Sequence, residues 1–157
     1  MYNISKHISY REATRSNTAI RFGINNHPSS KVLDTMRLTA NKIFEPIRKH
    51  FGVPIYVSSF YRSWVLNKKL GGSKTSSHVL GEAIDLDDVL GGVTNSEMFY
   101  WIKDNLDFDQ LIWEYGSDFE PNWIHVSYRK GSNRNQVLKA VRYRTWYGKF
   151  KTRYEIF

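Results

Sequence analysis

The stretch His78-Val-Leu-Gly81-Glu-Ala83-Ile-Asp85-Leu-Asp87 predicts a tight turn that leads into a strand. Glycine adopts the left-handed backbone conformations that tight turns require, so Gly81 permits a turn directly after His78. The alternation from Gly81 onward has the two-residue period of a strand and places Ala83, Asp85 and Asp87 on one face. We expect this geometry to bring the His78 imidazole back over the Asp85 carboxylate.

A second histidine lies in Trp123-Ile-His125-Val-Ser127, where the same alternation places Trp123, His125 and Ser127 on one strand face. Two imidazoles and one carboxylate form a common catalytic zinc site, which leaves a fourth position for water. The spacing alone also permits a plainer interpretation. In that interpretation both histidines are half-buried hydrogen-bonding residues, and the aspartate is a strand-end or helix-capping carboxylate.

A long helix is predicted over residues 31–50, with a serine at 29 or 30 as its cap and the glycine at 52 as its end. Pro46 lies inside this helix and is expected to kink it. The apolar residues that recur at helical spacing are Val32, Met36, Ala40, Ile43 and Ile47.

The other predicted elements are shorter. Strands are predicted over 55–61, 81–87, 108–115 and 123–128, the last two forming a hairpin around the loop 116–122. Short helices are predicted over 64–70, capped by Ser63, and over 98–106, after the capping box Thr94-Asn-Ser-Glu97. Together they predict an α+β fold, a single small domain over 1–157 in which helices pack on an antiparallel sheet. The short polar stretch 129–135 is the one linker candidate.

Composition narrows the function classes. The chain has 157 residues, of which 24% are charged and 15% aromatic, so it is not a disordered sequence. It has no cysteine, which excludes a disulfide scaffold, a thiol nucleophile and zinc ligation by sulfur. No apolar run has the length of a membrane-spanning helix or a signal peptide. We therefore expect a protein made in the cytoplasm without a signal peptide.

The net charge of +8 is unevenly distributed. Residues 1–77 carry thirteen Lys and Arg against three Asp and Glu, whereas residues 78–128 carry one against eleven. Residues 129–157 carry nine against one. This pattern fits carboxylates gathered at a site between cationic surfaces for an anionic polymer, or an ordinary solvated surface. It is also consistent with nucleic-acid binding, which the acidic middle argues against.

Three motifs resemble one known family. Ser76-Ser-His78-Val-Leu-Gly81-Glu-Ala83-Ile-Asp85 resembles the Ser-x-His-x-x-Gly-x-Ala-x-Asp signature of the zinc D-Ala-D-Ala carboxypeptidase-like family. Val57-Ser-Ser-Phe-Tyr61-Arg62-Ser63 is similar to its Ser-Gly-Tyr-Arg-Ser strand end, with Phe60 in place of the usual glycine. Trp123-Ile-His125-Val-Ser resembles its second-histidine strand. The resemblance covers about residues 10–128, fits the phage and bacterial branch, and implies the hedgehog/DD-peptidase fold.

The resemblance implies roles for individual residues. It makes His78, Asp85 and His125 the ligands of one Zn²⁺ per chain. It places Arg62 near the metal, where it binds the substrate carboxylate or the developing oxyanion, the alternative being a structural ion pair. It gives Ser76 a hydrogen bond to a ligand or to the loop, the alternative being a plain turn residue.

One position departs from the family pattern. Members often carry a carboxylate three residues before the second histidine as general base, and here that residue is Asn122. Two nearby carboxylates can replace it, Glu114 and Glu120. A hairpin centred near residues 119–120 places Glu114 opposite residue 124 or 125, and in the second register it lies beside His125. Partial burial would raise the pKa of Glu114 toward that of a working base, whereas Glu120 lies at the loop tip.

The implied function is a zinc metallopeptidase that hydrolyses peptide bonds of peptidoglycan, as a carboxypeptidase or an endopeptidase. We expect the protein to act as a monomer at the bacterial cell wall, as a phage or prophage lysis enzyme. The rival hypothesis is a non-catalytic zinc-containing cell-wall-binding module of the same fold, which Asn122 favours.

The C-terminal segment 129–157 alternates cations with aromatic residues. We expect its aromatic side chains to pack a short strand or helix onto the domain and its cations to point outward. Such a surface would dock on an anionic cell-envelope polymer, separately from the chemistry. The aromatic residues able to stack on sugars or to pack in the core are Trp101, Trp113, Trp123, Tyr128 and Trp146.

Overall fold

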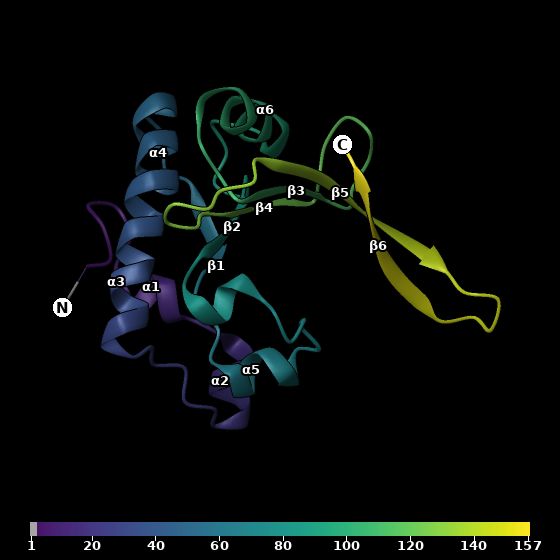
Figure 1. The fold of residues 1–157 in the computed structure, drawn as a ribbon, viewed down its shortest axis with the longest axis horizontal. Helices are drawn as coiled ribbons and strands as arrows, with labels where there is room; N and C mark the ends of the chain where they lie inside the picture. Colours follow the sequence, from purple (N-terminus) through teal and green to yellow (C-terminus); the bar gives the residue numbers. More distant parts are fainter. Residues whose placement is uncertain (1–2) are drawn as a thin grey trace.

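The computed structural model describes residues 3–157 and contains one six-stranded sheet of order β1-β2-β4-β3-β5-β6 (Figure 1). The strands are β1 Tyr56–Ser59, β2 Ala83–Asp87, β3 Gln110–Glu114, β4 Trp123–Ser127, β5 Gln136–Arg144 and β6 Phe150–Ile156. The helices are α1 Tyr10–Thr14, α2 Asn17–Phe22, α3 Ser30–Thr39, α4 Glu45–Phe51, α5 Trp64–Lys69 and α6 Asn95–Asn105. The predicted α+β class is confirmed. No helix in the described part of the chain is long and apolar enough to span a bilayer.

The long predicted helix is present as α3, a π-helical turn (η1, Ala40–Phe44) and α4 in direct succession. The Ser29 side chain accepts a hydrogen bond from the Val32 N–H at its start, and Gly52 ends it with a φ of 69°. Proline lacks an N–H, and its ring clashes with the carbonyl four residues earlier, so a wider turn accommodates Pro46. This π-helical turn ends at Phe44, two residues before Pro46.

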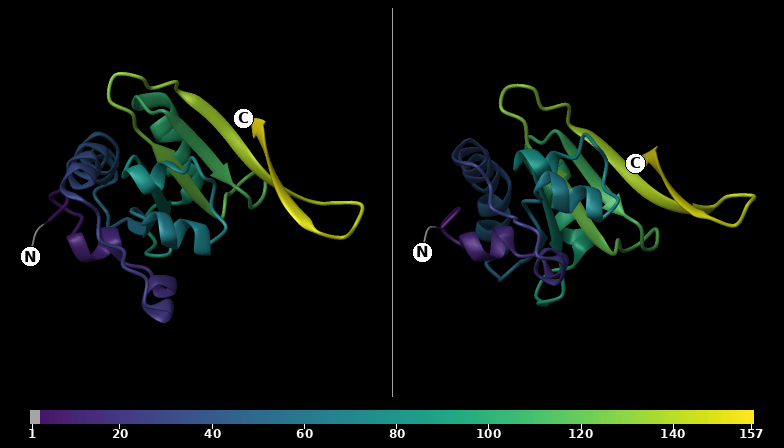
Figure 2. Two further views of the ribbon diagram at one scale, coloured as in Figure 1. Left: turned by 60° about the horizontal axis from the view of Figure 1, so that its bottom comes forward. Right: turned by 90° about the horizontal axis from the view of Figure 1, so that it is seen from below.

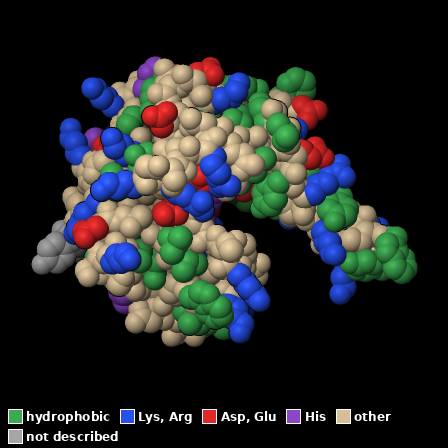
Figure 3. All heavy atoms as spheres, in the orientation of Figure 1, with side chains coloured by type: hydrophobic (Ala, Val, Ile, Leu, Met, Phe, Trp, Pro, Cys, Tyr) green, Lys and Arg blue, Asp and Glu red, His purple; other side chains and the backbone are tan. Residues whose placement is uncertain are grey.

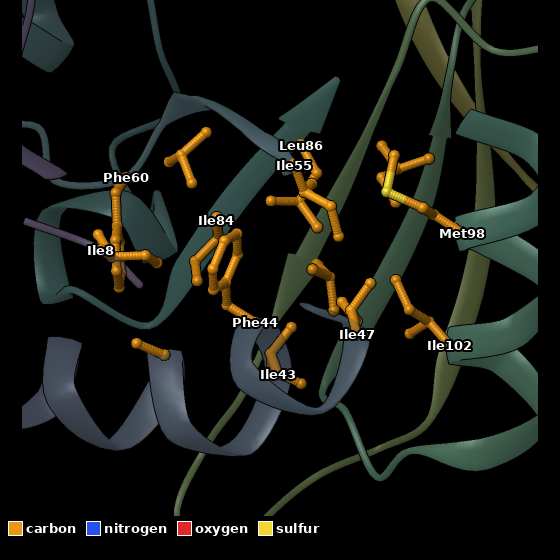
Figure 4. Packing of buried hydrophobic residues seen from close by; sticks show 14 of the residues in the cluster. Ile8, Ile43, Phe44, Ile47, Ile55, Phe60, Ile84, Leu86, Met98 and Ile102 are labelled. Atoms are coloured by element: carbon orange, nitrogen blue, oxygen red, sulfur yellow. The ribbon is translucent and has the colours of Figure 1, made fainter. Parts of the chain in front are cut away.

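One face of the sheet carries the hydrophobic core, because side chains alternate between the two faces along each strand. The core residues on this face are Ile84, Leu86, Leu111, Trp113, Ile124 and Val126, all buried. Helices α3, α4 and α6 and the turn η1 cover it. Their buried hydrophobic residues are Met36, Ala40, Ile43, Phe44, Ile47, Met98, Phe99 and Ile102. Figure 4 labels five of them, namely Ile43, Phe44, Ile47, Met98 and Ile102. The opposite face of β2, β4 and β3 is thereby left for polar residues.

The sheet is not antiparallel throughout, which corrects one detail of the prediction. β3 and β5 pair in parallel, from Gln110 opposite Gln136 to Glu114 opposite Ala140. The chain reaches β5 through residues 128–135, and Arg134 donates two hydrogen bonds of 2.7 and 2.6 Å to the buried Asp109 carboxylate. The stretch 129–135 is therefore a loop held on the domain.

Strands β5 and β6 form a hairpin that projects from the body (Figures 1 and 2). The expected packing of the C-terminal aromatic residues is wrong for most of them, since Trp146 is 96% and Phe150 67% exposed. The physical reason is that β6 is the last strand of the sheet and pairs with β5 alone. Phe157 is different: its ring centroid lies 4.7 Å from that of Phe99 and 5.4 Å from that of Trp113.

Gly81 ends the 3-10 turn η2 (Ser77–Leu80) with a φ of +74°, and a Cβ there would lie 2.6 Å from the buried side chain of Met36. We expect Gly81→Ala to lower the free energy of unfolding by about 2 kcal/mol or more, part from the backbone and part from the clash. Gly52→Ala is the matched control, because Gly52 has a φ of +69° but no atom within 4 Å of that Cβ. Thermal unfolding measures both, and equal losses would show that the contact with Met36 has no effect.

Candidate metal centre

Adjacent strands bring two of the three predicted ligands together. β2 and β4 are antiparallel neighbours, and Asp85 lies directly opposite His125 in their register. Directly paired residues point to the same face of a sheet, and Nδ1 of His125 lies 2.8 Å from Oδ1 of Asp85. This pairing confirms the expected faces of both strands.

The turn at Gly81 brings the third predicted ligand, His78, to the other two. His78 lies in η2, and the chain reverses at Gly81 before it enters β2. Nε2 of His78 consequently lies 3.1 Å from the same Oδ1 of Asp85. One potential ligand atom from each of the three residues lies within 4.8 Å of the others. The structure thus gathers the cluster that the sequence predicted.

The protonation of His78 shows that this cluster fits a cation. Nδ1 of His78 lies 2.6 Å from the Phe60 carbonyl oxygen, which only accepts, so Nδ1 carries the proton. Burial lowers the pKa of His78, against the opposing effect of the Asp85 charge, and favours the neutral ring. A neutral ring then turns the Nε2 lone pair toward the lone pairs of Asp85. A metal ion bound to both atoms removes this repulsion.

The distances also suit zinc. Ligand atoms bound tetrahedrally at about 2.0–2.1 Å lie roughly 3.3 Å apart. The two imidazole nitrogens lie 2.8 and 3.1 Å from Oδ1 of Asp85, which is close to this value. Burial alone would raise the pKa of Asp85, but the charged and polar groups around it hold that pKa well below its usual range. Asp85 is therefore an anionic ligand at neutral pH.

Arg62 holds the other oxygen of Asp85. Its Nη2 donates to Oδ2 of Asp85 at 2.8 Å, and its Nε donates to Oγ of Ser59 at 2.9 Å. The ion pair that the sequence left as an alternative is therefore present, and its partner is a candidate metal ligand. This contact fixes the orientation of the carboxylate, as partners outside a ligand set do in metal sites.

Glu114 lies on the same face as the cluster, although its expected register is wrong. It pairs with Trp123, and Ile112 pairs with His125, because the hairpin closes one residue earlier than predicted. The shift from residue 125 is two residues, so the side chain still points to the cluster face. Burial raises the pKa of Glu114 to about 7, with His125 opposing this shift and Asp85 adding to it.

The other candidate base, Glu120, and the residue at the usual position of the base, Asn122, lie elsewhere. Glu120 accepts hydrogen bonds from the backbone N–H of Ser96 at 2.8 Å and from its hydroxyl at 2.6 Å, so it holds the start of α6. The Asn122 side chain is exposed, and its backbone N–H donates to the Glu114 carbonyl at 3.0 Å. Neither residue lines the cleft that contains the cluster.

The cluster lies in a cleft of about 380 Å³ that Arg62, Ser76 and Glu114 also line. Ser76 lies in the wall of the cleft, and its side chain makes no capping hydrogen bond to η2. Leu138 and Tyr154 of the hairpin complete the wall. Sequence reasoning missed these two residues, because only the pairing of β3, β5 and β6 brings them beside Glu114.

A second cleft of about 650 Å³ adjoins the first and shares two of its lining residues, Arg62 and Trp123. Its other lining residues include Arg15, Ser16, Tyr56, Ser59 and Leu66. The polar face of the sheet is therefore open to a ligand on both sides of Arg62.

An α+β fold with two histidines and one aspartate clustered in a cleft is the arrangement expected of a zinc metallopeptidase. Comparison with protein families agrees, since residues 6–127 match the family described as Peptidase M15. The chain belongs to this zinc D-Ala-D-Ala carboxypeptidase-like family. Its membership supports a zinc peptidase that acts on peptidoglycan in general. No match was found among curated proteins.

We expect one zinc ion per chain, bound by the three clustered residues. His78→Ala is expected to lower the zinc affinity at least about tenfold, because removal of one ligand leaves two. The matched control is His27→Ala, which removes an exposed imidazole bonded to Tyr10. Elemental analysis and calorimetric titration measure content and affinity. Unchanged affinity in the His78 variant would exclude this ligand set.

The raised pKa of Glu114 predicts pH-dependent stability in the metal-free protein. The folded carboxyl keeps its proton up to about pH 7, against the ordinary value of 4.5. The stability contributed by that retained proton is complete below the ordinary value and is lost as pH rises through about 7. The side chain in the Glu114→Gln variant is neutral at every pH, so this variant does not lose that stability as the pH rises.

The expected result is that Glu114→Gln raises the free energy of unfolding by about 3 kcal/mol at pH 8.5, and by little at pH 4. Urea unfolding at the two pH values measures the difference. An equal effect at both values would contradict burial of an ionisable Glu114.

Proposed function

We propose that this protein is an endopeptidase that hydrolyses the peptide part of peptidoglycan, with His78, Asp85 and His125 as zinc ligands. The observation that carries the proposal is the His-Asp-His cluster in one cleft with a buried carboxylate, Glu114, outside the ligand set. When bound, Zn²⁺ supplies a Lewis acid that lowers the pKa of water and polarises a carbonyl.

Glu114 acts as the general base and then as the general acid. As a carboxylate it accepts a proton from the attacking water, whose oxygen forms the new bond to the peptide carbon. It returns that proton to the leaving amine when the C–N bond breaks. A pKa near 7 suits both transfers, because the group then exchanges its proton readily at neutral pH.

Arg62 stabilises negative charge on the substrate. A guanidinium has five N–H donors, and this one uses Nη2 for Asp85 and Nε for Ser59. Arg62 lines both clefts, so its remaining donors can reach a carbonyl oxygen or a carboxylate there. A fixed cation at this position stabilises the developing oxyanion.

The two adjoining clefts favour an endopeptidase over a carboxypeptidase. A carboxypeptidase needs room on one side of the scissile bond for a single terminal residue. Here the clefts continue on both sides of Arg62 and Trp123, which gives room for chain on both sides of the bond. Such an activity degrades cell walls, and the resemblance to the phage and bacterial branch supports a role as a phage or prophage lysis enzyme.

Mass spectrometry of muropeptides digested with the zinc-loaded protein tests the proposal. We expect cross-linked muropeptides to be cut internally, with new amino termini inside the stem or the cross-bridge. Release of terminal D-Ala alone would make the protein a carboxypeptidase. Bound zinc with no cleavage at all would select the non-catalytic binding module.

Two matched variants test the base. Glu114→Gln is expected to keep zinc and fold while losing about 10²–10⁴-fold in turnover. Glu120→Gln removes an equivalent carboxylate from the α6 contact and is expected to have a mild effect. The opposite ranking would assign the role to Glu120.

A further inference from the structure

The hairpin has two faces of different character. Pairing in the β5–β6 ladder places Arg142 opposite Thr152 and Arg144 opposite Phe150, on the same face as Ala140 and Tyr154. Ala140 is also the partner of Glu114 in β3. This face of the hairpin, here called the cleft face, therefore continues the polar face of the sheet. Its residues are Leu138, Ala140, Arg142, Arg144, Phe150, Thr152, Tyr154 and Ile156.

The cleft face is continuous with the cleft. Leu138 and Tyr154 line the cleft itself. Tyr115, which also lines it, is hydrogen-bonded through its hydroxyl to Oγ1 of Thr152 at 2.7 Å. The Arg142 guanidinium lies 5.3 Å from the centre of the Tyr115 ring. From Tyr154 to Phe150 the face extends the cleft by about 13 Å, at about 3.3 Å per residue.

The unpaired cations are unequally divided between the faces. On the opposite face Lys139 pairs with Asp118, and Arg153 pairs with Glu155. Within residues 3–157 no carboxylate forms an ion pair with Arg142 or Arg144. Nε of Arg144 donates to the Gly148 carbonyl at 3.4 Å. Among the described residues of the hairpin, the cleft face therefore offers two guanidinium groups without a carboxylate partner and no acidic side chain, whereas the opposite face has one such cation, Lys151. The cations of the hairpin, expected to point outward as one docking surface, are divided: Arg142 and Arg144 lie on the cleft face, Lys151 and Arg153 on the opposite face, and Lys149 in the turn.

The hairpin is held in shape at both ends. At its tip the Thr145 N–H donates to the Lys149 carbonyl at 2.7 Å, and the Lys149 N–H donates to Oγ1 of Thr145 at 3.0 Å. At its base Phe157 packs on Trp113 and Phe99. A preformed surface loses little conformational entropy when it binds.

Protection of an exposed strand does not explain this composition. Lysine and arginine on an edge strand prevent aggregation, but large exposed apolar residues promote it. Phe150, Trp146 and Ile156 are 67%, 96% and 91% exposed on or beside the cleft face. Figure 3 shows the molecule hollowed between this arm and the body, with apolar and cationic side chains along the arm.

We infer that the cleft face of the hairpin is an extended subsite for the glycan–peptide polymer of the cell wall. Guanidinium groups suit the carboxylates of stem peptides, and aromatic rings suit the apolar faces of sugars. This inference rests on the proposed function and adds to it a preference for polymeric over short substrates. It also gives the C-terminal segment a role in binding the substrate beside the catalytic site, whereas the sequence predicted a docking surface separate from the chemistry.

Two paired double variants test the inference. Arg144→Gln with Phe150→Ala removes one cation and one ring from a directly opposed pair on the cleft face. Tyr143→Ala with Lys151→Gln likewise removes one ring and one cation, from the neighbouring pair on the opposite face. Arg142→Gln, nearer the cleft, is an independent second variant.

The measurement is co-sedimentation with purified sacculi that have been stripped of accessory anionic polymers. All proteins carry Glu114→Gln and zinc, so the wall is not cut. We expect about tenfold weaker binding for the cleft-face pair and less than about twofold for the opposite-face pair. Binding should also weaken between 0.1 M and 1 M salt, because the Debye length falls from about 10 to 3 Å.

Equal losses for the two pairs, or no loss for either, would overturn the inference. So would binding only to walls that retain their accessory polymers, or light scattering that shows the arm pairing two copies of the chain. If these proteins bind sacculi through the cleft face while the zinc-loaded protein with an intact Glu114 cuts no muropeptide, the results would instead contradict the proposed function and support this subsite.

Discussion

A buried carboxylate must be satisfied by charged or polar partners, and the carboxylate of Asp85 takes its partners from three segments far apart in the sequence. One oxygen faces His78 and His125, and the other accepts from Arg62. The strand that carries it lies between β1 and β4 in the sheet. The turn after the first histidine, the β2–β4 register and the end of β1 all converge on this side chain.

The two-residue alternation of the strands separates stability from chemistry. On β2, Ile84 and Leu86 enter the core under the long helix, while Asp85 between them points to the cleft. On β3, Trp113 is buried in the core, while Glu114 faces the cleft from the next position. The site is therefore supported from behind by close packing, and its geometry can be rigid although every ligand belongs to a different element.

Local signals were sufficient for most of this arrangement. Apolar periodicity predicted the helix over 31–50, and the capping box at Thr94 and Glu97 predicted the start of α6. The His-Asp-His cluster was recognisable from Gly81 and from alternation around His125. The register that pairs Glu114 with Trp123 could not be predicted, because it depends on where the hairpin closes. Gly116 makes a close approach to the Glu120 carbonyl, with a φ of +74°, so the turn begins directly after β3. The parallel pairing of β5 with β3 has no local signature, so Leu138 and Tyr154 could not be placed beside the cleft.

The hairpin lies beyond the residues that match the family, which end at 127. It joins the sheet through one neighbouring strand, β3, and it supplies none of the three clustered ligands. The length and charge of this arm can therefore change without moving His78, Asp85 or His125. Its properties are separable from those of the metal centre.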